Sequence, residues 1–444
     1  MRRKSWTPED GGAKHIFRAL SHRNYRLFFG GQGVSLVGTW MQQIAMSWLV
    51  YRLTGSALLL GVVGFASQIP TFLLTTIAGV LVDRWEKRRI LVVTQTFAML
   101  QAFALAVLTL TESVVVWQIV ALSAFLGCVN AFDAPARQSF VVEIVQKREN
   151  LGNAIALNSF LFNGARLVGP SIAGIVIAFV GEGICFLLNG ISFAAVIVAL
   201  LAMRLPLSDR KEVHSDLVQG LKEGFRYSFG SVPIRTLLMS LAVVSLFGMP
   251  YAVLMPVFAK SILHGDSHTL GFLMGATGVG ALVGAMYLAS RKSVLGLGKL
   301  IPTATTVFGI GLMAFSQSTY VPLSLLLMLI VGLGMMVQMA STNTLLQTIV
   351  DDDKRGRVMS LYTMAFMGTA PFGSLISGSL AERIGAPSTL LIGGVICVVV
   401  AALFSRKLPV LQASVRPVYE KKGIIAPLAS GVESASELAV PPAD

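Results

Sequence analysis

The chain has 444 residues, of which 54% are hydrophobic and only 13% are charged, and its mean hydropathy is +0.73. A soluble domain carries about 25% charged residues, so this chain has too few charged groups to cover a surface that faces water. Its long apolar runs can each cross the hydrocarbon layer as a helix of about 20 residues. The composition therefore excludes a soluble protein and predicts an all-α membrane protein.

Taken in chain order, the apolar runs predict twelve transmembrane helices in two sets of six. The first set, at 26–51, 57–82, 90–110, 114–134, 152–179 and 183–203, forms an N-terminal lobe over 26–203. The second set, at 234–258, 269–289, 300–317, 321–343, 358–381 and 387–405, forms a C-terminal lobe over 234–405.

Three polar segments flank the two predicted lobes. Residues 1–25 are predicted to form an N-terminal arm, and 204–233 a central loop. Leu217, Leu221, Phe225 and Phe229 recur every four residues in this loop, which predicts a short surface helix. Residues 406–444 are rich in Pro, Ser, Ala and Glu, and we expect them to form a disordered tail.

The net charge of +13 raises the question of nucleic-acid binding. Most of the 35 Lys and Arg residues, however, fall in the terminal segments and in the loops on one side of the predicted bundle. Only Arg52, Lys260 and Arg383 fall on the other side, and Arg166 lies inside a span. By the positive-inside rule, this distribution predicts a multi-pass protein of the inner (cytoplasmic) membrane with both termini cytoplasmic. We expect no nucleic-acid partner.

The inventory of reactive side chains argues against an enzyme, a pump and a metal protein. The histidines lie in loops or in the N-terminal arm, and the cysteines in apolar runs without metal-ligand spacing (Cys128, Cys185, Cys397). No phosphate-cradling nucleotide motif is present. The sequence predicts no catalytic residue, no metal and no cofactor.

Glycine spacing indicates an internal duplication. When Leu157 is aligned with Leu361, Gly169 meets Gly373 and Gly174 meets Gly378. Two related six-helix repeats around a central path are a recurrent transporter plan. Chance spacing within glycine-rich helices is the alternative.

The turn after the second span carries the sharpest motif, Gly79-Val80-Leu81-Val82-Asp83-Arg84-Trp85-Glu86-Lys87-Arg88-Arg89. It resembles the loop motif Gly-x-Leu-Ala-Asp-Arg-x-Gly-Arg-Arg of the major facilitator superfamily, except that Glu86 replaces the second glycine. The resemblance implies a gating loop of Gly79, Asp83, Arg84, Lys87 and Arg88. In such a loop Asp83 meets the positive N-terminus of the eleventh span when the cytoplasmic side is closed. A loop that only orients the chain is the alternative.

The fifth predicted span carries a second motif, Gly164-Ala165-Arg166-Leu167-Val168-Gly169-Pro170-Ser171-Ile172-Ala173-Gly174. It resembles the antiporter motif Gly-Pro-x-x-Gly-Gly of exporters in this superfamily, with Ala173 in place of one glycine. The resemblance implies a role in export for Gly164, Gly169, Pro170 and Gly174. The alternative is a kink that serves only helix packing.

Arg166 is the one charged residue near the middle of a predicted span. A charge at this depth is costly and should face the bundle interior or a water-filled path. It could bind an anionic group, steer protons or pair with a polar neighbour.

Further segments resemble one branch of the superfamily, the enterobactin exporter and transmembrane secretion effector group. They include Asn24-Tyr25-Arg26-Leu27-Phe28, Leu53-Thr54-Gly55-Ser56 and Asp133-Ala134-Pro135-Ala136-Arg137-Gln138. This resemblance implies a secondary-active exporter of siderophore-like, drug-like or other amphipathic small molecules. It also implies alternating access and proton antiport, with the proton gradient as energy source and no bound cofactor.

Candidate substrate and coupling residues follow from these segments. Ser123 stands where proton-linked exporters often carry an arginine, so Asp133 is the nearest candidate proton carrier, with Arg137 in the same motif. The polar residues predicted to line the substrate path, with Trp40 as an apolar complement, are Gln42, Gln43, Gln68, Asn158, Asn163 and Gln338.

Two other functions fit the same fold, an importer working by proton symport and a non-transporting membrane scaffold or receptor. The expected partners are the small-molecule substrate and membrane lipid. We expect a monomer, and cooperation with periplasmic or outer-membrane export components remains an open alternative.

Overall fold

The structure is a computed structural model that describes residues 18–145, 148–204, 217–291 and 293–425. These residues form helices joined by short connections, without β-strands in the described ranges. The predictions for the beginning of the arm, for residues 205–216 of the central loop and for the tail beyond residue 425 lie outside the described residues.

The N-terminal lobe consists of six long helices that follow the short helix η2 (Arg18–Ser21). They are α2 (Arg23–Thr54), α3 (Ala57–Arg84), α4 (Lys87–Leu110), α5 (Val116–Ile144), α6 (Arg148–Val180) and α7 (Glu182–Ala202). Helix α2 packs against α6 and α7, while α4 and α5 pack against each other, α4 against α7 and α5 against α3. At 1.5 Å per residue, even the 21 residues of α7 extend about 32 Å, the thickness of a hydrocarbon layer.

The C-terminal lobe also provides six crossings, two of which are interrupted. Its helices are α9 (Val232–Phe247), α10 (Tyr251–Val257), η3 (Phe258–Ile262), α11 (Ser267–Ser290), α12 (Leu297–Ser316), α13 (Val321–Ile349), α14 (Arg355–Met367), α15 (Ala370–Ile384) and α16 (Ala386–Lys421). The seventh crossing breaks between α9 and α10 at Pro250, and the eleventh breaks between α14 and α15, just before Pro371. Proline explains both breaks because it lacks a backbone N–H and disfavours helix in the residue before it.

Twelve crossings in two lobes agree with the predicted fold class. Ten of them are long and apolar enough to span a membrane by length and composition alone, within the described residues. The other two are α2, whose buried face carries Gln32, Ser35 and Gln42, and the interrupted α14–α15 pair.

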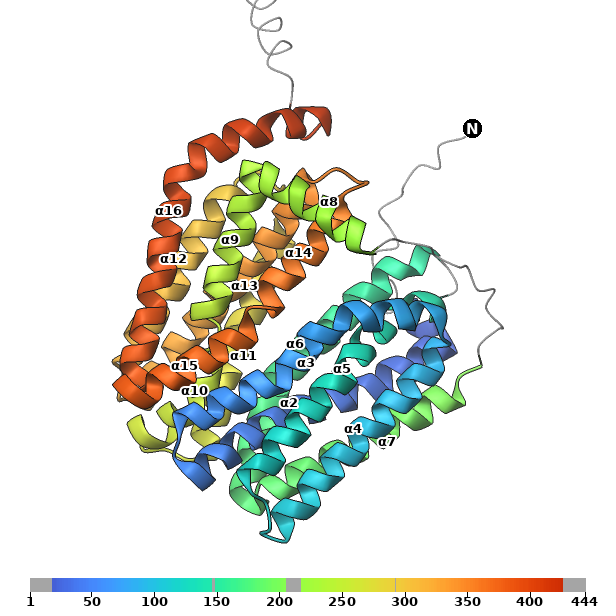
Figure 1. The fold of residues 1–444 in the computed structure, drawn as a ribbon, viewed down its shortest axis with the longest axis vertical. Coiled ribbons are helices and arrows are strands. Elements are labelled where there is room, and N and C mark those ends of the chain that lie inside the picture. Colours follow the sequence, from blue (N-terminus) through green and yellow to red (C-terminus); the bar gives the residue numbers. More distant parts are fainter. Residues whose placement is uncertain (1–17, 146–147, 205–216, 292, 426–444) are drawn as a thin grey trace, which may run out of the picture.

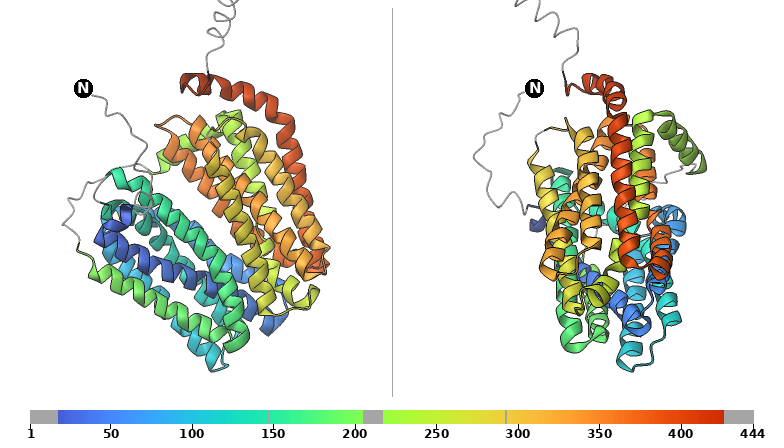
Figure 2. Two further views of the ribbon diagram at one scale, coloured as in Figure 1. Left: turned by 180° about the vertical axis from the view of Figure 1, so that it is seen from behind. Right: turned by 90° about the vertical axis from the view of Figure 1, so that its left-hand side faces the viewer.

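Figures 1 and 2 show that the two lobes meet at one end and diverge at the other. Helix α2 begins, and α16 ends, at the divergent end, which we call the termini side; the opposite end is the distal side. The closest packing between the lobes pairs α3 with α15 and α6 with α11, and α10 contacts α2 and α3. The lobes are therefore packed together on the distal side and diverge toward the termini side.

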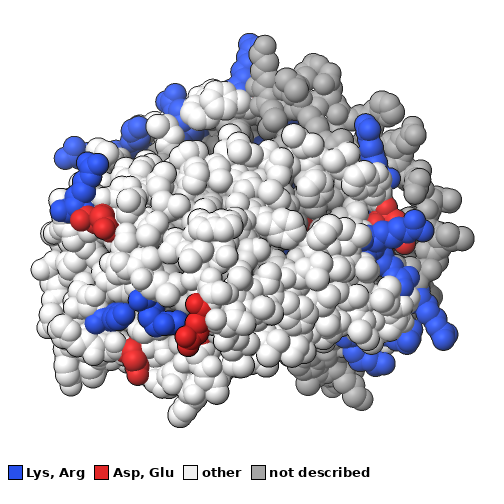
Figure 3. All heavy atoms as spheres, turned by 60° about the horizontal axis from the view of Figure 1, so that its bottom comes forward, with Lys and Arg blue, Asp and Glu red and all other residues white. Residues whose placement is uncertain are grey.

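The outer surface is suited to lipid. On the face seen in Figure 3, charged side chains lie toward the edges and a broad uncharged band lies between them. Large apolar side chains such as Leu73, Phe160 and Val198 are more than 60% exposed. Exposure of so many large apolar side chains is expected where the solvent is hydrocarbon.

Local sequence explains the turn between the first two spans. Gly55 ends α2 with φ 65°, a left-handed conformation that favours glycine. Ser56 then caps α3 by accepting a hydrogen bond from the backbone N–H of Leu59. The Gly55-Ser56 pair of the branch motif is thus a helix stop followed by a helix start.

The predicted central helix exists, since α8 (Leu217–Gly230) precedes α9 on the termini side. The Tyr227 hydroxyl of α8 donates a 3.0 Å hydrogen bond to Asp351, and burial raises the pKa of this hydroxyl. Arg357 forms an ion pair with Glu223. These contacts attach α8 to the C-terminal lobe.

The prediction that the disordered tail begins at residue 406 is wrong. Helix α16 continues to Lys421, because Leu411 and Val415 are buried against the core that includes Ile349 and Val350. The Lys422 ammonium further donates to the backbone carbonyl of Thr348 at 2.7 Å. The polar composition of this segment concealed an amphipathic helix extension.

Candidate functional site

Two glycine pairs bring the lobes into contact on the distal side. A Cβ on Gly174 of α6 would lie 3.0 Å from Cα of Gly271 in α11, and a Cβ on Gly61 of α3 would lie 3.0 Å from Cα of Gly378 in α15. Helix backbones approach this closely only where both residues are small. The glycines thus define two interlobe contacts, each between one helix of either lobe.

The positions of the glycines in these contacts agree with the internal duplication that the sequence indicates. Gly174 and Gly378, the aligned pair, occupy these two interlobe contacts. The other aligned pair packs within each lobe: a Cβ on Gly169 would lie 2.6 Å from Cβ of Trp40, and a Cβ on Gly373 would lie 2.3 Å from the carbonyl oxygen of Leu246. Chance spacing does not explain these equivalent positions.

Polar contacts also join the lobes on the distal side. The Glu382 carboxylate at the end of α15 accepts 3.1 Å hydrogen bonds from the Ser56 hydroxyl and the backbone N–H of Leu58 at the start of α3. The hydroxyls of Tyr51 and Ser261 lie 2.7 Å apart. The distal side is therefore closed in this structure.

Arg166 lies midway along α6, where the two lobes begin to separate. Its guanidinium is 3.6 Å from Sδ of Met335 in α13 and 5.8 Å from the centre of the Trp40 ring in α2. It also interacts with Tyr251, the first residue of α10, whose hydroxyl is 3.8 Å from the same sulfur. A cation and three large side chains from both lobes thus meet at the centre of the bundle.

Two of the predicted path residues are instead buried within a lobe. Gln42 donates to Gln101 at 2.9 Å and accepts from Asn189 at 2.8 Å, which joins α2, α4 and α7. Gln338 is 1% exposed. The Gln338 amide group has no hydrogen-bond partner among the described residues, whereas Gln42 belongs to a buried network. The burial of both side chains does not support a substrate-contacting role.

The remaining predicted path residues are more accessible. Gln43 is exposed, and Asn158, Asn163 and Gln68 are half-buried. The Asn163 amide donates to the carbonyl of Ser159 one turn earlier, and that of Gln68 to the carbonyl of Gly64. A role of these residues in substrate binding stays a prediction.

Asp133 and Arg137 form part of a polar cluster inside the N-terminal lobe. The Asp133 carboxylate is 4% exposed and accepts from Thr94 at 2.9 Å and Gln95 at 2.8 Å. Arg137 lies 3.6 Å from the carboxylate. The arrangement satisfies the ionised carboxylate and leaves its role as proton carrier a prediction.

The predicted gating loop lies at the α3–α4 turn on the termini side. Trp85 and Glu86 connect the helices with negative φ values of −105° and −67°, so the missing glycine of the motif is not needed here. Lys87 pairs with Glu143 at 3.8 Å, and Arg88 donates to the Leu201 carbonyl at 2.8 Å. Arg84 is exposed, and the side chain of Asp83 lies outside the described part of the structure.

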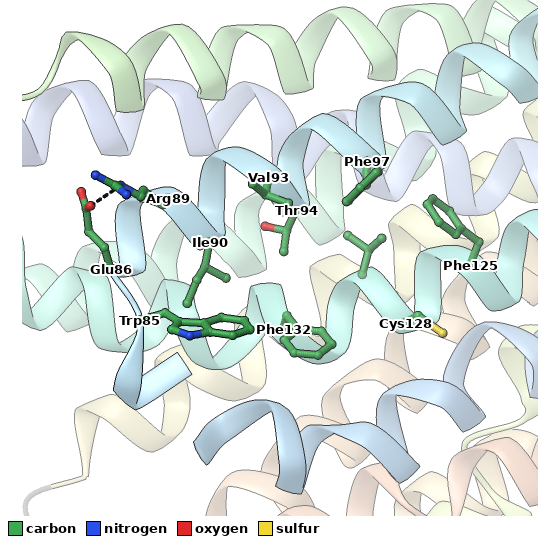
Figure 4. Close-up of a pocket in the computed structure, with 11 residues that line it drawn as sticks. Trp85, Glu86, Arg89, Ile90, Val93, Thr94, Phe97, Phe125, Cys128 and Phe132 are labelled. Carbon is green, nitrogen blue, oxygen red and sulfur yellow. Dashed lines mark ion pairs between the residues drawn. The ribbon is translucent and has the colours of Figure 1, made fainter. Parts of the chain in front are cut away.

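The same turn borders a groove on the side of the N-terminal lobe between α4 and α5. Figure 4 shows Trp85 and the ion-paired Glu86 and Arg89 at one end, and Phe97 and Phe125 at the other. The groove is lined mainly by apolar side chains and lies away from the interlobe opening, so we do not assign it to the substrate path.

Sequence reasoning missed two contributors to the site, Tyr251 and Glu382. Tyr251 follows Pro250, and this helix break was the available signal. Glu382 belongs to the segment Gly378-Ser379-Leu380-Ala381-Glu382-Arg383, which repeats the Gly-x-Leu-x-acid-Arg order of Gly79 to Arg84. A search of the sequence for a second copy of the pattern from Gly79 to Arg84 would have identified it.

Two six-helix lobes with a broken helix at the centre agree with the major facilitator superfamily, which the sequence motifs resemble. The chain belongs to the transmembrane secretion effector family of that superfamily, whose model matches residues 15–428. This membership confirms the family to which the loop and span-five motifs pointed, and with it a multi-pass membrane protein.

Relatives of similar length include transporters with different named substrates. The chain is 27% identical to a staphyloferrin A transporter of Staphylococcus aureus, over 86% of this chain and 96% of the relative. It is 27% identical to the multidrug efflux pump Tap of Mycolicibacterium fortuitum, over 81% and 88%, and 23% identical to macrolide efflux protein A of Streptococcus pyogenes, over 86% and 96%.

Solved structures share the fold at lower identity. A bacterial homologue of the human lysosomal transporter Spinster, in an inward-facing and unoccupied conformation, has a TM-score of 0.71 at 11% identity, covering 91% of this chain and 99% of that one. A bacterial homologue of the iron transporter ferroportin, in an inward-facing state, has a TM-score of 0.64 at 18% identity, covering 88% and 98%.

Proposed function

We propose that this chain is a secondary-active exporter that moves small amphipathic organic molecules across the inner membrane by alternating access. The observation that carries the proposal is the arrangement around Arg166: a mid-bundle cluster between the lobes, closed distally by the Gly174–Gly271 and Gly61–Gly378 contacts, with the lobes diverging toward the termini side. Such a site can load from one side only, as alternating access requires.

Sidedness comes from the loop charges. Because Lys and Arg concentrate on the termini side, the positive-inside rule assigns that side, and both termini, to the cytoplasm. The described state is then open to the cytoplasm. Substrate would bind near Arg166, the lobes would rock together on the cytoplasmic side, and the distal contacts would separate to release it outside.

Export rather than import is favoured by kinship and by the span-five motif. The relatives named as efflux proteins act on drugs and macrolides, and the family is described as one of secretion effectors. In α6, Gly169, Pro170 and Gly174 hold the helix against α2 and α11. No observation on the described residues favours the importer or the scaffold.

The coupling we propose is proton antiport, driven by the proton gradient without a bound cofactor. Asp133 is the candidate carrier. Its carboxylate accepts hydrogen bonds from Thr94 and Gln95 and lies 3.6 Å from Arg137. The chain would act as a monomer on its small-molecule substrate, with or without periplasmic or outer-membrane components.

Everted membrane vesicles test this function for any substrate that a total metabolite extract contains. The lumen of vesicles that contain the protein is acidified, which sets up the proton gradient. The vesicles are then incubated with the extract, and their contents are analysed by mass spectrometry. We expect at least one metabolite to accumulate with the wild type and not with Asp83→Asn, and to be lost when a protonophore collapses the gradient. Accumulation in right-side-out vesicles instead would establish an importer, and accumulation in neither would contradict transport.

A further inference from the structure

We propose that the central site selects an organic anion with an apolar or aromatic body, and that Arg166 holds its anionic group. This inference rests on the proposed function because it names the substrate class of that same site. It narrows the broad range of amphipathic molecules to one charge type.

The first support is the charge balance of the site. Arg166 forms no ion pair with a carboxylate among the described residues. By contrast, Arg137 of α5 lies 3.6 Å from Asp133, and Arg52 near the distal surface lies 2.7 Å from Glu182. An unpaired cation at mid-membrane depth is costly, and a bound anion would remove that cost.

The second support is the surface around the guanidinium. Trp40 packs edge-on against Phe162 with ring centres 5.9 Å apart, and the buried Met335 and Tyr251 contact the guanidinium from the other lobe. Aromatic rings bind apolar bodies, and a flexible methionine adapts to their shape. The site thus combines one guanidinium group with apolar and aromatic side chains around it.

The third support is access. Beyond Arg166 on the distal side, Leu167 and Gly174 of α6 are packed against Gly278 and Gly271 of α11. Two residues before Arg166, toward the termini side, a Cβ on Gly164 would meet nothing within 4 Å. Arg166, which is half-buried, therefore lies where the close packing of α6 against α11 ends.

A cationic substrate fits this site poorly. Its charge would repel the guanidinium, which forms no ion pair with an acidic side chain in the described part of the chain, and such repulsion disfavours cationic substrates. A neutral substrate would leave Arg166 unpaired. An anionic substrate with an apolar body would contact both the guanidinium and the apolar side chains around it.

Three probes with one aromatic body separate these possibilities: 2-naphthoate, 2-naphthamide and 2-naphthylmethylammonium. Binding to the purified full-length protein is measured by equilibrium dialysis. We expect naphthoate to bind about tenfold to hundredfold more tightly than the amide, as for hydrogen bonds to charged groups, and the ammonium to bind most weakly. Arg166→Gln should remove the difference, Arg166→Lys should retain part of it, and Arg406→Gln should leave it unchanged.

Equal binding of the three probes, or preference for the ammonium, would overturn the inference, as would binding of none. If Arg166→Gln still prefers the anion, that preference arises from another residue, and this result would also overturn the inference. Because binding is measured without a gradient, an anion preference without export in the vesicle assay would contradict only the proposed function.

A second, independent observation concerns Glu382, which we infer to be a distal latch equivalent to the predicted cytoplasmic latch of Asp83. Each acid occupies the same place in a Gly-x-Leu-x-acid-Arg segment, Asp83 at the end of α3 and Glu382 at the end of α15. Helices α3 and α15 pack side by side in opposite directions, so the two acids lie at opposite ends of the helix pair.

The distal latch is engaged in this structure. Glu382 accepts from the Ser56 hydroxyl and from the free N–H of Leu58 in the first turn of α3, across the lobe boundary. A carboxylate at a helix N-terminus is stabilised by the unpaired N–H groups and by the helix dipole. Glu382 thus stabilises the distally closed state and acts as a positioning residue.

Cysteine accessibility tests this latch. In a variant with Cys128, Cys185 and Cys397 replaced by alanine, Val253→Cys lies in the distal interlobe contact and is labelled by an impermeant maleimide only when that contact opens. Glu382→Gln should raise its labelling rate about two- to fivefold, the range expected for a charge at a helix terminus, and Glu382→Asp should raise it less.

Two controls make the result interpretable. Glu112→Gln changes another exposed distal carboxylate and should leave the Val253→Cys rate unchanged. Tyr320→Cys, at a position that is 66% exposed on the distal side, reports folding and orientation, since its labelling should be equal in all variants. An unchanged Val253→Cys rate in Glu382→Gln with normal Tyr320→Cys labelling would overturn the latch.

Discussion

Gly174 and Gly271 join the two lobes at a distance that leaves no room for a side chain: a Cβ on Gly174 would lie 2.7 Å from the carbonyl oxygen of Ser267 and 3.0 Å from Cα of Gly271. A glycine motif first noticed in one helix is thus half of an interlobe contact. Because this contact exists only while the distal side is closed, its glycines influence the balance between states.

Substitution of Gly174 should disturb transport far more than substitution of Gly164 in the same helix. Gly174→Val would overpack the closed contact, which costs about 1–3 kcal/mol, and should reduce export about tenfold or more by disfavouring the state open to the cytoplasm. Gly164→Val should be tolerated because a Cβ there meets nothing within 4 Å. Efflux measured at matched membrane abundance checks this, and equal losses would refute the assignment.

Gln42 and Gln43 are adjacent in sequence and should differ in their effects. Gln42→Leu breaks hydrogen bonds to Gln101 and Asn189, each worth about 0.6 kcal/mol on average within a membrane, so it should lower the melting temperature of the purified protein. Gln43→Leu, at an exposed position, should leave stability unchanged. Thermal unfolding in detergent distinguishes them, and a lower melting temperature for Gln43→Leu alone would contradict the burial pattern.

Asp133 and Arg137 should behave as a coupled pair. Asp133→Asn removes the carboxylate that Arg137 faces. Breaking a fully buried ion pair lowers the free energy of unfolding by about 3–5 kcal/mol. We expect a smaller loss here because Arg137 is partly exposed. The double variant Asp133→Asn with Arg137→Gln should recover part of the lost stability. If the single variant is fully stable but transports independently of the proton gradient, Asp133 is a proton carrier rather than a structural anion.

Asp83→Asn should abolish most export while leaving membrane insertion intact. The resemblance assigns Asp83 to the closure of the cytoplasmic side, where a carboxylate at a helix N-terminus contributes about 0.3–1 kcal/mol, and up to ~2 kcal/mol when partly buried. Glu86→Gln, three residues later and paired with Arg89, is the matched control and should export normally. An efflux rate of Asp83→Asn equal to that of the wild type would contradict a gating role for Asp83.

The sequence predicted the membrane class, the two lobes and the span positions because a hydrocarbon solvent imposes length and apolarity on each crossing. It also predicted that Arg166 faces the interior, since a charge at that depth cannot face lipid. It did not predict that Gln42 would be buried in a network, because a path and a buried polar cluster use the same residue types. The α16 extension was missed because its apolar residues are widely spaced among polar ones.

The contacts made by Arg166 depend on the chain's three-dimensional arrangement. Tyr251 and Met335 are far from Arg166 in sequence, and only the packing of the broken seventh crossing against α6 brings them together. A search for a second Gly-x-Leu-x-acid-Arg segment, apart from the aligned duplication, could have revealed Glu382, since its segment repeats that of Asp83. Long-range placement, rather than local pattern, was the missing information.

The central claim is that the lobes rock about the site of Arg166, so that one side closes as the other opens. Spin labels in a cysteine-free background measure both sides by electron resonance, with a distal pair at Trp117→Cys and Tyr320→Cys and a termini-side pair at Val142→Cys and Val410→Cys. When the purified protein in nanodiscs is shifted between states by pH or by a bound anion, we expect one distance to lengthen as the other shortens. Two distances that lengthen together, or neither changing under any condition, would contradict alternating access by rocking lobes.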